Sequence, residues 1–292
     1  MTTIEKVKYL AKRAIPWRLR YHIKIWEAEG KIRIPNRLKT HGDVNEYNHT
    51  LYNILDELGI KDNLLNKTVC EIGPGEYCSH AALEYQMGAD REILIDIKDF
   101  VGLENLAVPD HLRLDPERYQ IIRELPEISD NETWMGLLKI INGFYYTNGF
   151  EDYKRIPNNS VDICFGVSIL QHIRKKFFVS SIKEIYRFMS PGGVAWFYVD
   201  LRDMIGGKKN HLRFAADVWE DHTHYNMDNY TNRLSYSEMR DIFLSEGFEI
   251  KTAKVARFSK MPISRCYLSE EFRDMTDKDL MISQFIIQLV KK

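Results

Sequence analysis

The segment that most constrains the fold of this chain runs from Thr68 to Asp96. It begins with the apolar stretch Thr68–Ile72, passes through a turn that contains Gly73 and Gly75, and ends with a second apolar stretch over residues 92–96. A buried strand, a glycine turn, a helix and another strand form the repeating unit of a parallel α/β sheet. The glycines let the backbone approach a ligand closely, and an acidic residue about twenty positions later can hold both hydroxyls of a ribose. The segment therefore predicts a nucleoside pocket.

Two residues near the turn narrow the choice of ligand. The dinucleotide fingerprint GxGxxG would place a third glycine at position 78, where this chain has Cys78. That glycine allows tight packing around a pyrophosphate, so its absence argues against NAD or FAD. Glu71, two residues before Gly73, points the same way, because a carboxylate there repels phosphates and suits a cationic ligand.

The rest of the chain continues the alternation of strands and helices. After residues 92–96 we expect helical segments within residues 100–143, a weak strand at 143–146 and a clear strand at 161–167. A helix through Phe178 and Ile185 should stop at Ser190-Pro191-Gly192-Gly193, with further strands at residues 194–199, 248–256 and 284–290 and a helix at 237–246. This pattern predicts an α/β fold with a mostly parallel, Rossmann-like sheet.

The N-terminal part differs from the rest in charge. Residues 1–40 carry eleven Lys or Arg and three Glu, a local charge of +8, which leaves -9 for the remainder of the chain. Residues 4–15 have one apolar helical face, residues 17–25 fit a strand or a second basic helix equally well, and residues 47–58 look helical. We therefore expect a basic helical extension over residues 1–66 and a main domain over residues 67–292. The basic segment could meet nucleic acid, anionic lipid or the acidic remainder of its own chain.

The cysteines and the hydropathy pattern indicate the compartment. The four cysteines, Cys70, Cys78, Cys164 and Cys266, form no CxxC pair, so neither a disulfide framework nor a zinc ribbon is predicted. No apolar run has the length of a membrane span, and the N-terminus lacks the apolar core of a signal peptide. We expect a cytoplasmic protein, with peripheral association at the inner membrane face as an open alternative.

Four motifs in order carry a resemblance to a known family. Glu71-x-Gly73-x-Gly75 resembles motif I, acidic-x-Gly-x-Gly-x-Gly, of the class I S-adenosylmethionine-dependent methyltransferases, although Tyr77 replaces the last glycine. Three further segments resemble that family's Asn-Ser-Phe-Asp, Ser-x-Leu-Glu-His-Val and Leu-x-Pro-Gly-Gly: residues 159–162, residues 168–173 with Gln171 in place of Glu, and residues 189–193. The resemblance implies a seven-stranded sheet with an antiparallel last strand, and S-adenosylmethionine as the cofactor.

The resemblance also implies roles for single residues. Gly73 and Gly75 should leave room for the methionine part of the cofactor, with Glu71 oriented towards its ammonium. Asp96 should accept hydrogen bonds from both ribose hydroxyls, and Ile97 should pack on the adenine. Glu151 or Asp152 should accept a hydrogen bond from the adenine amine. Ser168 should line the C-terminal edge of the sheet, where the cofactor would bind.

A second, shorter resemblance concerns the acceptor. Asp200-Leu201-Arg202-Asp203, Trp219 and Asn232-Arg233-Leu234 are similar to segments of methyltransferases of polysaccharide and lipopolysaccharide assembly, which implies a saccharide hydroxyl as acceptor and an insert over residues 201–235 that covers it. A hydroxyl has to lose a proton, and histidine is the usual base. The candidates are His172, His211, His222 and His224. No third ligand accompanies His222 and His224 at a clear spacing, so we expect no metal.

Other classes of protein remain as alternatives or are disfavoured. A short-chain dehydrogenase needs Tyr-x-x-x-Lys, which is absent. The Asn/Asp-Pro-Pro-Tyr motif of amino-methylating DNA enzymes does not follow the strand at 161–167, so no nucleic-acid partner is expected. A methyltransferase acting on another small molecule or on nucleic acid, and a non-catalytic S-adenosylmethionine-binding protein, stay open.

Overall fold

The computed structural model describes residues 44–60, 63–75, 78–101, 112–127, 133–204, 207–221 and 230–292, together with Leu19 and His22. The predictions for the rest of residues 1–43, and those for His222 and His224, lie outside these residues. The chain divides into two compact units. The larger comprises residues 41–199, 237–255 and 285–292, and the smaller comprises residues 1–40, 200–236 and 256–284. The expected boundary at residue 66 stays a prediction.

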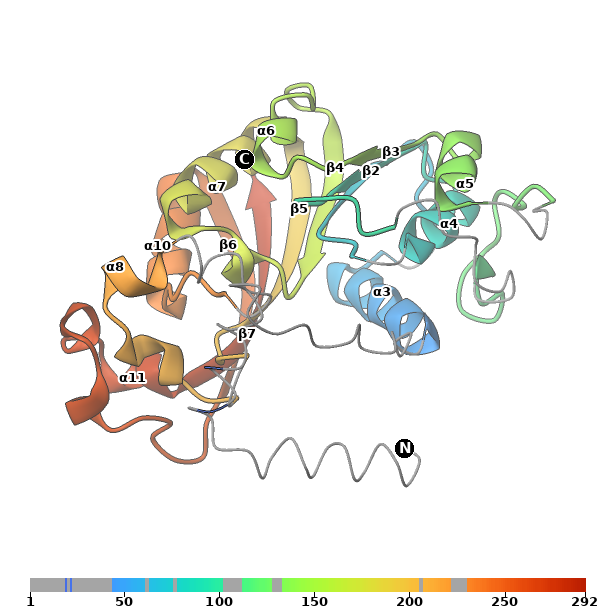
Figure 1. Ribbon diagram of the computed structural model, residues 1–292. Helices are drawn as coiled ribbons and strands as arrows, with labels where there is room; N and C mark the ends of the chain where they lie inside the picture. The colour runs from blue at the N-terminus through green and yellow to red at the C-terminus, as the bar shows by residue number, and fades with distance from the viewer. Residues whose placement is uncertain are drawn as a thin grey trace. The chain divides into compact units, whose positions relative to one another are not determined.

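Seven strands of the described residues form one sheet, in the order β3-β2-β1-β4-β5-β7-β6. The first five strands pair in parallel, and β7 runs antiparallel (Figure 1). This is the sheet that the resemblance implies, so the predicted fold class is confirmed. The bounds are β1 Thr68–Ile72, β2 Arg91–Ile95, β3 Gly143–Tyr146, β4 Val161–Val167, β5 Met189–Asp200, β6 Phe248–Arg257 and β7 Ile282–Lys291.

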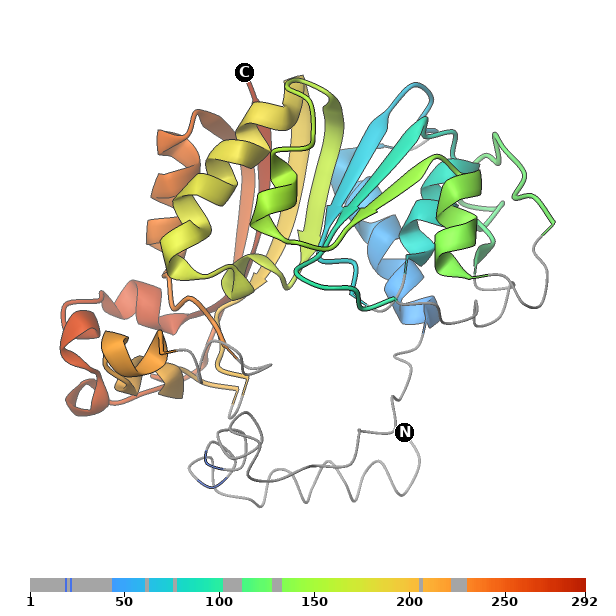
Figure 2. The same cartoon turned by 45° about the horizontal axis from the view of Figure 1, so that its top comes forward.

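Helices cover both faces of the sheet (Figures 1 and 2). Leu51 and Leu55 of one helix pack with Ile163 and Phe165 of β4 on one face. Rings of Phe178, Phe197 and Phe243 meet on the other face. No helix within the described ranges is long and apolar enough to cross a membrane. The first face carries α3 Val44–Leu58, α4 Ser79–Gln86 and α5 Trp134–Ile140, and the second carries α6 Phe150–Tyr153, α7 Lys175–Phe188 and α10 Tyr236–Ser245.

The start of β5 differs from the prediction. We expected Pro191-Gly192-Gly193 to form a turn before a strand at 194–199, but β5 already begins at Met189. Met189 pairs with Val161, and Val194 pairs with Ile163. The chain therefore advances by five residues along β5 while it advances by two along β4, and the register shifts between the two pairs. The Pro-Gly-Gly segment thus forms a bulge inside the strand, where a proline and a glycine at φ +77° are tolerated.

The smaller unit joins the predicted insert to a second segment, residues 256–284. Its apolar core contains Leu212, Ile263, Leu268, Phe272 and Leu280, so both segments contribute. The sequence pattern did not reveal this pairing, because residues 258–281 have no strong periodicity. The elements are η3 Asn210–Arg213, α8 Ala216–Trp219, η4 Arg265–Tyr267, η5 Glu270–Phe272 and α11 Asp277–Met281.

Candidate functional site

The strand order creates a ligand-binding crevice at one place on the sheet. β1 lies between β2 and β4, so the chain builds β2 and β3 on one side of β1 and then crosses to the other side. At such a switch point the connections leave in opposite directions, and ligands bind at the carboxyl ends of the strands. Gly73 follows β1, Asp96 follows β2 and Ser168 follows β4, so residues predicted from three separate motifs meet at this edge.

The glycine turn has a conformation and a packing that only glycine satisfies. Gly73 and Gly75 have φ values of +75° and +68°, in the left-handed region. A Cβ at Gly73 would lie 2.6 Å from Cγ1 of Ile169, the residue that follows Ser168. A Cβ at Gly75 would meet no described atom within 4 Å. Gly73 is therefore needed for packing within the protein, whereas Gly75 borders open space.

The carboxylate of Asp96 is fixed by hydrogen bonds from two backbone N–H groups. Its Oδ2 accepts a hydrogen bond from the N–H of Gly75 at 3.1 Å, and its Oδ1 accepts one from the N–H of Ile97 at 2.7 Å. Burial raises the pKa of the Asp96 carboxyl above its usual range and Glu71 adds to the rise, although the two backbone N–H groups oppose it. A carboxylate offers about four acceptor positions, so each oxygen can still accept one hydroxyl.

An exposed apolar side chain stands directly beside this buried carboxylate. Asp96 is 5% exposed, but its neighbour Ile97 is 71% exposed. The N–H of Gly149 donates to the carbonyl oxygen of Asp96 at 2.8 Å, which brings the loop after β3 against Ile97. A Cβ at Gly149 would lie 3.3 Å from Cγ2 of Ile97. A planar apolar group could therefore pack on the exposed side chain of Ile97 while a ribose binds the neighbouring carboxylate of Asp96.

The two carboxylates that were expected near an adenine amine have other partners. Glu151 is exposed and forms an ion pair with Lys154 at 2.7 Å. Asp152 is buried and accepts hydrogen bonds from the backbone N–H of Asn148 at 2.8 Å and from Arg155 at 3.3 Å. Burial alone would raise the pKa of Asp152, but these donors outweigh it and lower that pKa. Asp152 therefore stabilises the turn that presents Gly149, whereas Glu151 forms a surface ion pair.

The turn after β4 combines backbone strain with a buried amide. Ser168 has a φ of +53°, rare for a residue with a side chain, and such strain concentrates at functional sites. Its N–H donates to Tyr198 O at 2.9 Å, and His172 ends the short helix η2 Leu170–His172, half-buried. Gln171 is 1% exposed, and neither Nε2 nor Oε1 of its side chain has a hydrogen-bond partner.

Glu71 has a partner that sequence reasoning missed. Nδ1 of His80, in the first turn of α4, lies 3.0 Å from Oε1 of Glu71, and the two side chains are 0% and 2% exposed. Two further carboxyls, those of Glu84 and Glu92, are buried and interact electrostatically with Glu71. Burial raises the pKa of Glu84 to about 7 and raises that of Glu92 as well. A histidine nine residues after the glutamate carries no recognisable motif.

In the smaller unit, one expected base is fully enclosed. His211 is buried against Trp219, with ring centroids 6.1 Å apart, and burial lowers the pKa of its imidazole to about 3. It is therefore neutral at physiological pH. Within the described ranges, no group of three or more His, Cys, Asp or Glu is arranged to hold a metal ion.

Comparisons with known proteins yield matches in fold only. No family model and no curated protein matches this chain. Among solved structures, geranyl diphosphate C-methyltransferase from Streptomyces coelicolor is 10% identical with a TM-score of 0.49, and the match covers 89% of this chain and 86% of that one. An S-adenosylmethionine-dependent methyltransferase from Mesorhizobium loti is also 10% identical, with a TM-score of 0.44 and coverages of 78% and 93%. An arsenic(III) S-adenosylmethionine methyltransferase from Chlamydomonas reinhardtii is 13% identical, with a TM-score of 0.41 and coverages of 79% and 65%. At such values, function has to be inferred from the geometry of the site itself.

Proposed function

We propose that this protein is an S-adenosylmethionine-dependent methyltransferase that acts on a small polar acceptor. The observation that carries the proposal is the cradle at the switch point. Asp96 keeps one acceptor position free on each oxygen, Gly75 borders open space, and Ile97 is exposed beside them. A nucleoside needs this combination of a carboxylate for two hydroxyls and an apolar surface for the base.

The charges of the cradle favour a ligand without phosphates. Of the described residues, Asp96 and Glu71 are acidic and lie next to the turn, and each raises the electrostatic cost of an anion nearby. A cationic nucleoside, by contrast, is attracted to such a site. S-adenosylmethionine meets the requirement and supplies an electrophilic methyl group on its sulfonium.

The chain's own residues would then bind, orient and accept a proton. Positioning the acceptor beside the cofactor can contribute about 7–11 kcal/mol of the rate enhancement. If the acceptor is a hydroxyl, His172 at the carboxyl end of β4 is the described histidine nearest in sequence to the strained turn, and it is our first candidate for the base. His222 and His224 remain candidates from the sequence.

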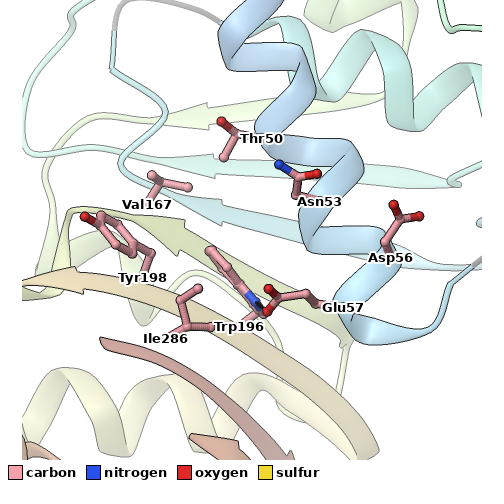
Figure 3. A pocket seen from close by; sticks show the side chains of 8 residues that line it. All are labelled: Thr50, Asn53, Asp56, Glu57, Val167, Trp196, Tyr198 and Ile286. Atoms are coloured by element: carbon pink, nitrogen blue, oxygen red, sulfur yellow. Dashed lines mark hydrogen bonds between the residues drawn. The ribbon is translucent and has the colours of Figure 1, made fainter. Parts of the chain in front are cut away.

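A groove on the same unit supports a polar acceptor (Figure 3). It has a volume of about 420 Å³, and α3 contributes its polar wall while β4, β5 and β7 contribute the opposite wall. Val167 and Tyr198, which pair with each other near the carboxyl ends of β4 and β5, belong to it. The lining residues are Thr50, Asn53, Asp56, Glu57, Val167, Trp196, Tyr198 and Ile286.

The charges in this groove are already compensated. Asp56 pairs with Arg118 at 2.7 Å, and Glu57 pairs with Lys254 at 3.1 Å and accepts from the indole of Trp196 at 2.9 Å. None of the eight lining residues is Lys, Arg or His. The lining of the groove thus offers hydroxyl, amide and carboxylate groups, and the nearby cations Arg118 and Lys254 are already paired with its carboxylates, which favours a neutral hydroxylated acceptor such as a saccharide over a phosphate.

Binding of S-adenosylhomocysteine tests the cofactor proposal directly. Calorimetry should show binding to the wild-type protein and a loss of about 1.5–3 kcal/mol in Asp96→Asn, because hydrogen bonds to a charged acceptor are lost. Asp90→Asn is the matched control, since Asp90 precedes β2 at its other end and pairs with Arg123 on the surface. No binding by the wild type, or equal affinity of both variants, would refute the proposal.

The acceptor class can be tested separately by methyl transfer. The protein is incubated with S-adenosylmethionine labelled in its methyl group and with matched panels of neutral saccharides and the corresponding sugar phosphates. We expect label in neutral saccharides, reduced by Asn53→Leu. Labelling of sugar phosphates alone would exclude this assignment of the groove while leaving the methyltransferase proposal intact.

The basic N-terminal segment suggests where the acceptor is found. Its charge of +8 over residues 1–40 favours a surface of anionic lipid or a lipid-linked acceptor. Each Lys or Arg near such a surface contributes about 1 kcal/mol before screening by salt. We propose weak association with anionic vesicles that is lost at high salt and on deletion of residues 1–26. No sedimentation with vesicles at low salt would favour contact with the acidic remainder of the chain.

A further inference from the structure

The glycine turn is bracketed by a buried side-chain contact that nothing in the chemistry of methyl transfer requires. Glu71 precedes the turn on β1, and His80 follows it in the first turn of α4. Their side chains meet at 3.0 Å in the interior, so one interaction joins β1 to α4 across the loop that connects them, residues 73–78. We propose that His80 is a positioning residue that holds this loop in its ligand-binding form, an inference that rests on the proposed cofactor.

The surroundings of His80 fix the ring on more than one side. Phe165 of β4 lies 5.8 Å from the imidazole centroid, with the ring planes tilted by 54°. The imidazole is 0% exposed, so it is not available to meet an acceptor or cofactor itself. His80 therefore acts through Glu71 and through the start of α4, which distinguishes it from a catalytic residue.

Two backbone contacts to β2 and to the residue that follows it act on the same turn. The N–H of Gly73 donates to the carbonyl oxygen of Ile95 at 2.8 Å, and the N–H of Gly75 donates to Asp96 at 3.1 Å. Glycines lose more backbone entropy on ordering than other residues. Backbone that is fixed at these two glycines before the ligand arrives does not have to be ordered during binding, and such preorganisation strengthens affinity.

The test compares three substitutions at one position. Asn places its amide nitrogen near the position of the histidine Nδ1, so His80→Asn should keep the contact with Glu71. His80→Leu removes the donor, and His80→Gln places the amide one bond further away. We expect S-adenosylhomocysteine to bind His80→Asn within about threefold of wild type and His80→Leu at least tenfold more weakly, with His80→Gln between them.

Hydrogen exchange provides a readout that does not need the cofactor. Peptides covering residues 72–79 should exchange faster in His80→Leu than in wild type, and at the wild-type rate in His80→Asn. His211→Leu is the matched control, because it also removes a fully buried histidine, and it lies in the smaller unit. It should change stability without changing exchange in residues 72–79.

The outcomes separate this inference from the proposed function. If the wild type does not bind S-adenosylhomocysteine, the cofactor proposal fails, and the exchange data alone decide whether His80 fixes the loop. If the wild type binds and His80→Leu is folded with unchanged affinity and exchange, the positioning role is wrong. Should His80→Leu fail to fold, equal affinity and exchange of His80→Asn and His80→Gln would overturn the dependence on the Nδ1 position.

Discussion

The buried pair Glu84 and Glu92 should make the stability of this protein fall as the pH rises through neutrality. Glu84 lies on α4 and Glu92 on β2, both side chains are buried, and each carboxyl raises the cost of charging the other. Two buried carboxyls that interact in this way cannot both be charged without a large cost, so at least one keeps its proton in the folded state. Burial accordingly raises the pKa of Glu84 from 4.5 to about 7.

The sign and size of the effect follow from proton linkage. Between pH 4.5 and 7 the folded state holds a proton on Glu84 that the unfolded chain has lost, so folding stability decreases with pH. The contribution is complete below the unfolded pKa and is lost as the pH passes the folded one. Since one unit of pKa corresponds to about 1.4 kcal/mol, the loss is about 3 kcal/mol.

Glu84→Gln isolates this contribution, because its amide never takes up the charge and can donate to Glu92. We expect its free energy of unfolding to equal that of wild type near pH 4.5 and to exceed it by about 3 kcal/mol at pH 8. Urea denaturation at both pH values measures the difference. Titrating groups that do not interact with Glu84, including His211, cancel because both proteins contain them.

The control and the refuting result are equally specific. Glu249→Gln removes an exposed carboxylate that pairs with Lys292 on the surface, and such a pair contributes about 0–1 kcal/mol. Its difference from wild type should show little dependence on pH. If the difference in unfolding free energy between wild type and Glu84→Gln is also constant from pH 4.5 to 8, the pKa of Glu84 is not raised in the folded protein and the reasoning is refuted.

Three further predictions concern single positions. Gly73→Ala and Gly75→Ala both place a side chain at positive φ, which costs about 1–2 kcal/mol of stability each, but Gly73→Ala should lose more because its Cβ would lie 2.6 Å from Ile169. Equal losses in thermal denaturation would contradict this packing. Gln171→Leu should raise the free energy of unfolding by about 1–3 kcal/mol, since it removes a buried side-chain amide that has no hydrogen bond to the described residues. A large destabilisation would show that the amide has a partner. Arg233→Lys should destabilise the smaller unit by about 1–3 kcal/mol, because Arg233 donates to Phe214 O and to Glu271 and its guanidinium lies 4.8 Å from the Phe272 ring centroid. Unchanged unfolding of that unit would show that these contacts of Arg233 do not stabilise it.

The sequence by itself determined the local elements of the candidate site. Thr68–Ile72 forms β1 as predicted, and β2 covers Arg91–Ile95, one residue earlier than the predicted 92–96, so that Asp96 follows it. These assignments succeed because alternation of strand and helix, glycine conformation and strand-end carboxylates depend on residues close together in the chain. The identity of Gly73 and Gly75 already required positive φ or close approach, and both have positive φ.

Tertiary structure alone decided which side chains are partners. The contact of Glu71 with His80 and the raised pKa values of Glu84 and Glu92 arise because α4 packs back on β1 and β2 and the side chains are buried in a low dielectric. Asp152 was predicted from its place after β3, but the structure turns its carboxylate towards Asn148. Residues 256–284 join the insert only through packing in the smaller unit. Such contacts depend on the relative placement of elements, which local sequence patterns do not encode.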